Sequence, residues 1–201
     1  VLLVGLAVTL SAVLGKRSHT WYVTTGFVKG RIFEYGLWAV GAFAIGIGVL
    51  PLVAALAALV RPRGLPADPR RRAFAALSLS AFVVFGAYTA IKAAYISTTL
   101  AIIVAERNLI YLYPVVFAGT ALLLERRRVS AVALGAATAF ALYLVTSMQL
   151  TLGSYPNYEA HGLSIAAFAN RILKWPAETI ETTLILLTVG SATALLVLGW
   201  I

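Results

Sequence analysis

The chain has 201 residues, of which 61% are hydrophobic and only 11% are charged. A soluble globular domain has about 25% charged and about 45–50% apolar residues, so this composition excludes an ordinary water-soluble domain and predicts an integral membrane protein. The net charge of +9 is divided among short connecting segments. Nucleic-acid binding needs a clustered basic face, so we expect no nucleic-acid partner. Cysteine is absent, which rules out disulfides and thiolate metal sites.

Six apolar stretches have lengths close to those that cross a bilayer. About 20 helical residues cover a hydrocarbon core of about 30 Å, and runs that are apolar on every face favour helices over a barrel. The expected spans are residues 1–15, 35–60, 72–91, 106–124, 129–152 and 182–201. The predicted fold is therefore all-α, a polytopic transmembrane bundle that forms one domain over residues 1–201. Because the outer stretches run into both chain ends, we expect a fragment of a longer protein.

Two arginine-rich connections predict how the bundle is oriented. Residues 61–72 contain five arginines and residues 125–128 contain three. With six spans these connections fall on the same side, and the positive-inside rule assigns that side to the cytoplasm. The opposite, outer segments are longer and contain both histidines and five of the seven acids. We therefore expect any binding site on the outer face.

Two outer segments are expected to lie along the membrane surface. Residues 16–34 mix aromatic, basic and hydroxyl side chains. This pattern is typical of an aromatic belt with basic anchors, or of a platform that binds an anionic lipid head at Lys29 or Arg31. Residues 163–175 repeat apolar side chains at helical spacing but are too short to cross. They predict an amphipathic helix that lies on the membrane or covers a lipid-linked substrate.

Glu106 and Arg107 interrupt the apolar run of residues 100–124. A charge at membrane depth costs about 2.5–3.5 kcal/mol on insertion scales and indicates function. Neighbouring helical residues point about 100° apart, so each needs another partner: a lipid phosphate, a sugar or another side chain. Alternatively, the pair marks the outer boundary of the span. Tyr111 follows Arg107 by four positions on the same predicted face, and Pro114 is expected to kink the helix.

The two histidines, His19 and His161, are about 140 residues apart and have no local metal-ligand spacing. We therefore expect no metal site and assign no cofactor. Glycines such as Gly41, Gly46 and Gly48, and Gly135 with a nearby alanine, predict close helix packing.

The stretch Glu-Arg-Asn-Leu-Ile-Tyr-Leu-Tyr-Pro at residues 106–114, with the basic turn at residues 125–128, carries a family resemblance. It resembles the C-terminal transmembrane half of actinobacterial polytopic proteins that are similar to GT-C glycosyltransferases, which use polyprenyl-phosphate sugars. The resemblance covers about residues 31–128. It implies a multi-pass protein of a bacterial plasma membrane whose partners are membrane lipid and a polyprenyl-phosphate-linked sugar. The residues expected to bind the lipid phosphate or the sugar are Glu106, Arg107, Tyr111, Arg31 and His161.

The same family places its catalytic acid in the first outer loop, and this chain departs from that pattern. Its single aspartate, Asp68, lies in a predicted cytoplasmic turn. We therefore leave the catalytic residues unassigned and expect a portion of a membrane glycosyltransferase that uses a lipid-linked sugar at the outer face. A transporter or flippase fragment, which often contains broken helices, is an alternative. A non-catalytic membrane scaffold is another.

Overall fold

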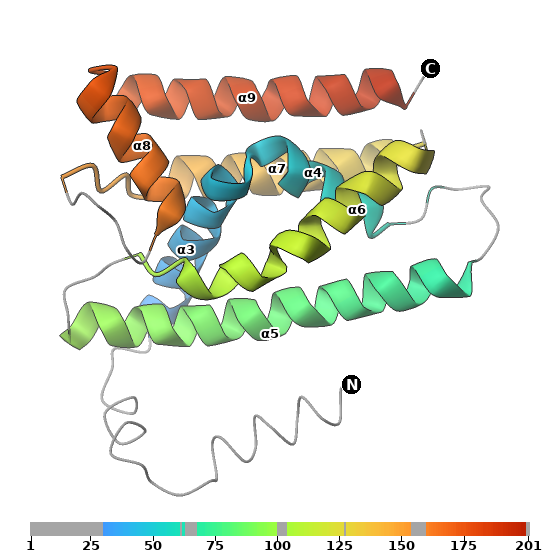
Figure 1. Cartoon of the computed structure of the whole chain (residues 1–201), viewed down its shortest axis with the longest axis horizontal. Coiled ribbons are helices and arrows are strands. Elements are labelled where there is room, and N and C mark those ends of the chain that lie inside the picture. The colour runs from blue at the N-terminus through green and yellow to red at the C-terminus, as the bar shows by residue number, and fades with distance from the viewer. Residues whose placement is uncertain are drawn as a thin grey trace, which may run out of the picture.

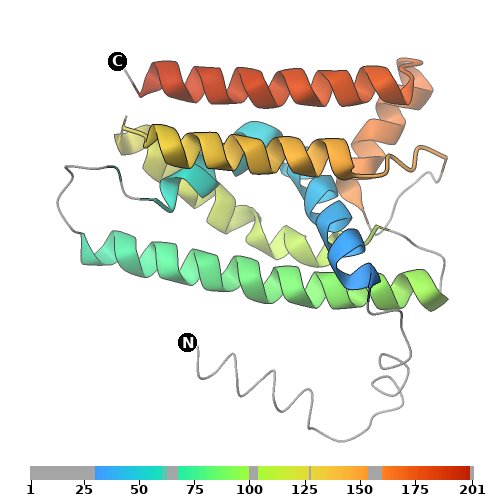
Figure 2. The same ribbon diagram turned by 180° about the vertical axis from the view of Figure 1, so that it is seen from behind.

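The computed structural model describes residues 30–60, 62, 68–99, 104–126, 128–153 and 160–199. All regular structure in these ranges is helical, which confirms the all-α prediction. The helices α5 (Pro69–Thr99), α7 (Ala131–Ser147) and α9 (Ala177–Leu198) run along the long axis of the molecule (Figures 1 and 2). The other described elements cross or connect them: α3 (Arg31–Ile47), α4 (Val49–Ala58), η1 (Arg107–Leu112), α6 (Tyr113–Arg126) and α8 (His161–Ile172).

Three helical segments of the described chain are long and apolar enough to span a membrane: Pro69–Ser97, Arg107–Arg126 and Ala177–Leu198. The bent pair α3 and α4 makes a fourth if it is counted as one span. The apolar helix α7 has 17 residues, fewer than the about 20 that cross an average bilayer. These helices support a membrane protein, whereas the predicted number of about six spans is not confirmed. The first expected span, residues 1–15, lies outside the described residues.

The outside of the bundle is apolar along its long helices. Only 11% of the most apolar 18-residue stretch of α5 is buried. Large side chains such as Leu79, Val83 and Tyr88 are more than half exposed. Exposing apolar surface to water costs about 25 cal/mol per Å². A lipid environment removes this penalty, so the apolar exterior fits the membrane prediction.

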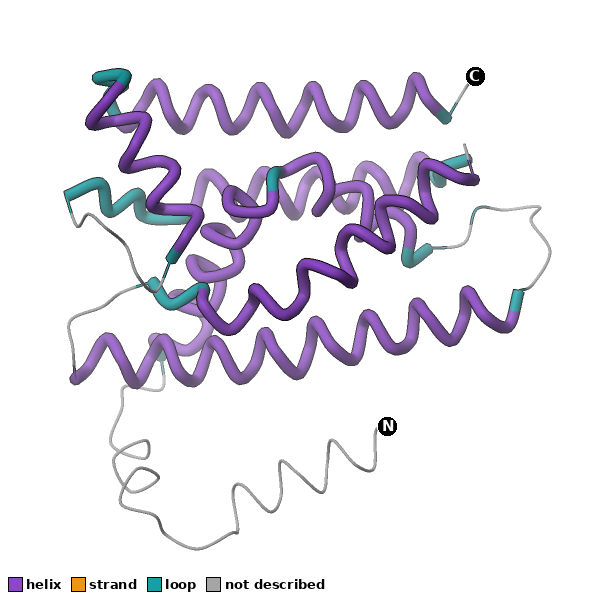
Figure 3. The backbone as a smooth tube through the Cα atoms, in the orientation of Figure 1, coloured by secondary structure: helices purple, strands orange, loops and turns teal. Residues whose placement is uncertain are grey.

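The predicted span at residues 35–60 is not one straight helix, because α3 and α4 meet at an angle of 108° (Figure 3). Gly48 lies at the bend with φ +86, which glycine adopts without the steric penalty of a Cβ. Pro51 follows in the first turn of α4. Its missing N–H has no helical partner at that position in any case. Hydropathy does not register this change of direction, so the expected span at residues 35–60 is present as a bent pair of helices.

The stretch around Pro114 also differs from the prediction. Residues Arg107–Leu112 form the 3-10 helix η1, and α6 begins at Tyr113. Pro114 therefore lies in the first turn of α6, where proline is tolerated, instead of kinking a helix from within. The predicted kink is wrong because the chain changes helix type before the proline.

Small residues let the helices of the core approach closely. A Cβ at Gly119 of α6 would lie 3.0 Å from the Cβ of Ala55, and one at Gly41 would lie 3.0 Å from the carbonyl oxygen of Leu144. The predicted packing role is therefore confirmed for Gly41. Gly135 has nothing within 4 Å of such a Cβ, so it does not mark a close approach among the described residues.

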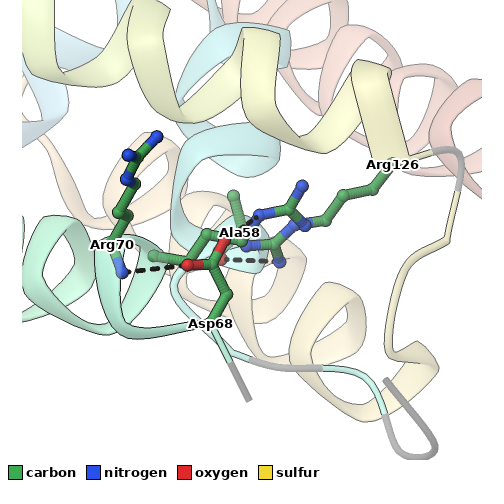
Figure 4. A network of polar contacts seen from close by, with 5 residues as sticks. Ala58, Asp68, Arg70 and Arg126 are labelled. Carbon is green, nitrogen blue, oxygen red and sulfur yellow. Dashed lines mark hydrogen bonds and ion pairs between the residues drawn. The ribbon is translucent and has the colours of Figure 1, made fainter. Parts of the chain in front are cut away.

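The two arginine-rich connections meet at one end of the bundle, as the sequence predicts. The Arg126 Nη1 donates a hydrogen bond to the carbonyl oxygen of Ala58 at 3.5 Å (Figure 4). Asp68 accepts a bond from the backbone N–H of Arg70 at 2.9 Å and pairs with the Arg71 Nε at 3.1 Å. We call this the arginine-rich end; its cytoplasmic location stays a prediction.

We predict that Gly119→Ala destabilises the bundle by about 1–3 kcal/mol, because the new methyl group overpacks the contact with Ala55. The matched control is Gly135→Ala, which places its methyl group in open space and improves helix propensity by up to about 1 kcal/mol. The free energy of unfolding in detergent measures both. Equal stabilities for the two variants would contradict the tight α4–α6 packing.

Candidate functional site

Glu106 lies where η1, α3 and α8 meet, and its side chain is fully buried. The Glu106 Oε2 accepts a hydrogen bond from the backbone N–H of Gly162 at 2.8 Å. Gly162 is the second residue of α8, so its N–H has no partner within the helix. A carboxylate is favourable there, because the N-terminus of a helix carries a partial positive charge. Glu106 therefore fixes the N-terminus of α8 to the start of η1.

Two glycines make room for this contact. A Cβ at Gly162 would overlap the carbonyl oxygen of Ala42 on α3, so α8 approaches α3 only with glycine at this position. A Cβ at Gly46 would lie 2.8 Å from the Glu106 Oε1 and 3.0 Å from the Tyr113 hydroxyl. The last turn of α3 therefore presents no side chain at the point where the Glu106 carboxylate packs against it.

The second carboxylate oxygen has a different environment. The Glu106 Oε1 is buried and makes no hydrogen bond of good geometry with the described residues, although the Tyr113 hydroxyl is close enough to interact with the carboxylate. Glu106 precedes the Arg107–Arg126 segment, and burial raises its pKa to about 7. The N–H groups of Gly162 and His161 and the Tyr113 hydroxyl limit the increase. An acid with such a pKa exchanges its proton near neutral pH, which an ordinary surface glutamate does not.

Arg107 and His161 flank this buried contact. Arg107 directly follows Glu106 and His161 directly precedes Gly162, so the hydrogen bond brings two segments that are distant in sequence to one place. Both side chains are exposed. Three of the five predicted site residues, Glu106 included, therefore meet at the junction of η1 and α8.

The other two predicted residues do not join this junction. Tyr111 is 70% exposed and its ring lies 6.0 Å from that of Phe85 on α5. Because a 3-10 helix has three residues per turn, Arg107 and Tyr111 do not share a face, and that prediction is wrong. The guanidinium of Arg31 lies 5.7 Å from the ring centre of Tyr35. Fifteen residues separate Arg31 from Gly46 on α3, roughly 22 Å along the helix.

The amphipathic helix expected at residues 163–175 is present as α8, which ends three residues earlier, at Ile172. Beyond it, Lys174 has φ 58 and the Asn170 Nδ2 donates to the Trp175 carbonyl oxygen at 2.7 Å. The predicted apolar stripe divides into two faces. Leu163 and Ala167 are buried, while the exposed apolar side chains are Ile165, Phe168 and Ile172.

Sequence reasoning missed Gly162, Gly46 and Tyr113, which complete the surroundings of Glu106. Gly162 stands at the start of an amphipathic stretch, yet nothing in that pattern identifies a carboxylate 56 positions earlier as its partner. Gly46 was expected only to allow close packing. Among the described residues no group of three or more His, Cys, Asp or Glu could hold a metal ion.

No protein-family model matches the chain, and no curated protein or solved structure is similar to it. The resemblance to GT-C glycosyltransferases therefore stays a prediction from residues 106–114.

Asp68 lies at the arginine-rich end, where α5 begins, whereas Glu106 lies at the junction of η1 and α8.

We predict that the stability of the chain falls as pH rises through 7, because the folded state holds a proton on Glu106 that the unfolded state releases near pH 4.5. The loss between these pH values amounts to at most about 3 kcal/mol. Glu106→Gln keeps an oxygen that can accept the bond from Gly162 but cannot ionise, so it should lose this dependence. Unfolding in detergent across pH 4 to 8 measures both proteins, and identical pH dependence would contradict the buried titration.

Proposed function

We propose that the chain is a portion of a membrane glycosyltransferase that binds the phosphate of a lipid-linked sugar at the outer face. One observation supports this proposal above the others. The bond between Glu106 and Gly162 joins η1 to α8, and exposed Arg107 and His161 stand on either side of it. Two donor-bearing side chains from separate helices thus lie at one end of an apolar bundle.

The chemistry of the two side chains suits a phosphate. The planar guanidinium of Arg107 can give two parallel charge-assisted hydrogen bonds to one phosphate group. The imidazole of His161 adds a further N–H donor. Phe168 and Ile172 expose an apolar face of α8 against which a polyprenyl chain can lie. A lipid phosphate can therefore bind the donors of Arg107 and His161 through its phosphate and the apolar face of α8 through its polyprenyl chain.

Glu106 has a positioning role in this proposal. Its side chain is fully buried beneath α8, so it does not reach a sugar at the surface. It holds the N-terminus of α8 beside η1 and thereby sets the separation of Arg107 and His161. Tyr111 and Arg31 have no role at the junction in this proposal, because Tyr111 lies beside Phe85 and Arg31 beside Tyr35.

We predict that Arg107→Ala weakens binding of polyprenyl phosphate by about tenfold, as expected when charge-assisted bonds to phosphate are lost. Arg72→Ala is the control, because Arg72 is exposed in the first turn of α5 at the arginine-rich end. Binding to the chain in detergent is measured for polyprenyl phosphate and for the uncharged polyprenol. Equal affinities of the Arg107 and Arg72 variants, or equal binding of the uncharged lipid, would contradict the proposal.

Proton-coupled transport is a second candidate, and the broken helix α3–α4 favours it. Transporters often place ion sites beside helices that are interrupted within the membrane. Here Gly46, two residues before the bend, faces a buried carboxylate with one oxygen that makes no hydrogen bond of good geometry with the described residues. Proton uptake and release at Glu106 would alter how tightly α8 is held against α3.

If transport is the function, Glu106→Gln abolishes proton movement while preserving the contact with Gly162. The control is Glu178→Gln, which changes an exposed acid in the first turn of α9. A pH-sensitive dye inside vesicles that contain the chain reports proton entry under an imposed gradient. Proton entry that persists in the Glu106 variant excludes this mechanism. The glycosyltransferase proposal instead expects this variant to retain polyprenyl phosphate binding.

A further inference from the structure

A cavity of about 350 Å³ lies at the arginine-rich end, between the last turns of α6 and α9. Leucine side chains from both helices line most of it, together with Val129 and Gly199. Within the part of the chain that the structure describes, Arg128 is the only charged residue in its lining. The cavity therefore combines an apolar interior with one cation, and it lies at the opposite end from Glu106.

The packing of α9 explains where the cavity lies and how it opens. A Cβ at Gly199 would lie 3.0 Å from the Val129 Cγ1, so the end of α9 rests closely on the segment before α7. Leu123 and Leu195 are buried and form the inner wall. Leu124 and Leu198 are 45% and 48% exposed and form the rim. The cavity is thus continuous with the apolar exterior of the bundle.

The end of the bundle where the cavity lies carries an excess of positive charge. The described residues at this end include five arginines, Arg70, Arg71, Arg72, Arg126 and Arg128, against two acids, Asp68 and Glu125. Asp68 is already paired with Arg71 at 3.1 Å. The Arg126 Nε is buried and has no hydrogen-bond partner among the described residues. An anion beside Arg128 therefore enters an excess of positive charge.

We infer that this cavity binds one acyl chain of an anionic phospholipid whose phosphate contacts Arg128. The volume lies at the lower end of the about 300–1,000 Å³ typical of ligand pockets, enough for part of a single chain. A free phosphate leaves the leucine lining empty, and a zwitterionic phospholipid brings a cation that is unfavourable in the excess of positive charge at this end. Basic pockets between transmembrane helices bind acidic lipid heads by the same combination of forces.

The experiment measures lipid retained by the full 201-residue chain in detergent, by native mass spectrometry. The chain is mixed with equal amounts of phosphatidylglycerol and phosphatidylcholine that have identical acyl chains. We expect one phosphatidylglycerol to be retained with a preference of about tenfold, because the choline cation of phosphatidylcholine is unfavourable beside the excess of arginines at this end. Inorganic phosphate at the same concentration should not displace it, since phosphate lacks an acyl chain.

Two variants separate the head group from the chain. Arg128→Gln should abolish the preference for phosphatidylglycerol, while Arg70→Gln removes the same charge from an exposed residue outside the cavity lining and should leave it intact. Leu198→Trp should fill the cavity and release the lipid. Leu186→Trp makes the same change on α9 at a residue that is 66% exposed and does not line the cavity.

Several results would overturn the inference. Equal losses in the Arg128 and Arg70 variants would show attraction by diffuse charge. Unchanged retention in the Leu198 variant would show that no chain enters the cavity. Equal retention of the two phospholipids by the unaltered chain, or displacement by inorganic phosphate, would exclude the proposed ligand even if a variant fails to fold.

Discussion

The hydrogen bond between the Glu106 carboxylate and the N–H of Gly162 determines how the short helices are arranged. In a lipid environment a backbone N–H without a partner costs several kcal/mol, and so does a buried charge. The hydrogen bond between the N–H and the carboxylate offsets much of both costs. The helix N-terminus carries partial positive charge where the carboxylate lies. The carboxylate packs this closely against α3 because Gly46 has no side chain. The bend at Gly48, two residues later, directs α4 toward the arginine-rich end.

Packing by small residues complements this polar contact. Lipid tails are as apolar as leucine, so the hydrophobic effect contributes little to association between helices within a bilayer. Van der Waals contact must replace it, and glycine and alanine bring helices close enough for that. Gly36 opposite Ala90 and Gly119 opposite Ala55 join α3 to α5 and α4 to α6. Many large apolar side chains, such as Leu79, Val83 and Leu186, nevertheless remain on the outside.

The sequence predicts those properties that each segment has by itself. The expected spans at residues 72–91 and 182–201 fall on the long helices α5 and α9, and arginine density marks the end where two connections meet. The surroundings of Glu106 could not be predicted, because its partner is 56 positions away and is a backbone group, which leaves no signature in the side chains. The bend at Gly48 was equally hidden, since a glycine within an apolar run fits a straight packed helix as well as a reversal.

The charged side chains are arranged differently at the two ends of the bundle. At the junction of η1 and α8 an acid is buried and arginine and histidine flank it, so binding there depends on a fixed separation between two helices. At the other end, Arg128 lies in the lining of an apolar cavity, and the described arginines of that end outnumber the acids. A site of the first kind can distinguish one phosphate-bearing head group from another. A site of the second kind distinguishes anionic from neutral lipids. Because η1 precedes α6 and the last turn of α6 lines the cavity, the two proposed sites lie at opposite ends of this helix and need not compete for the same lipid.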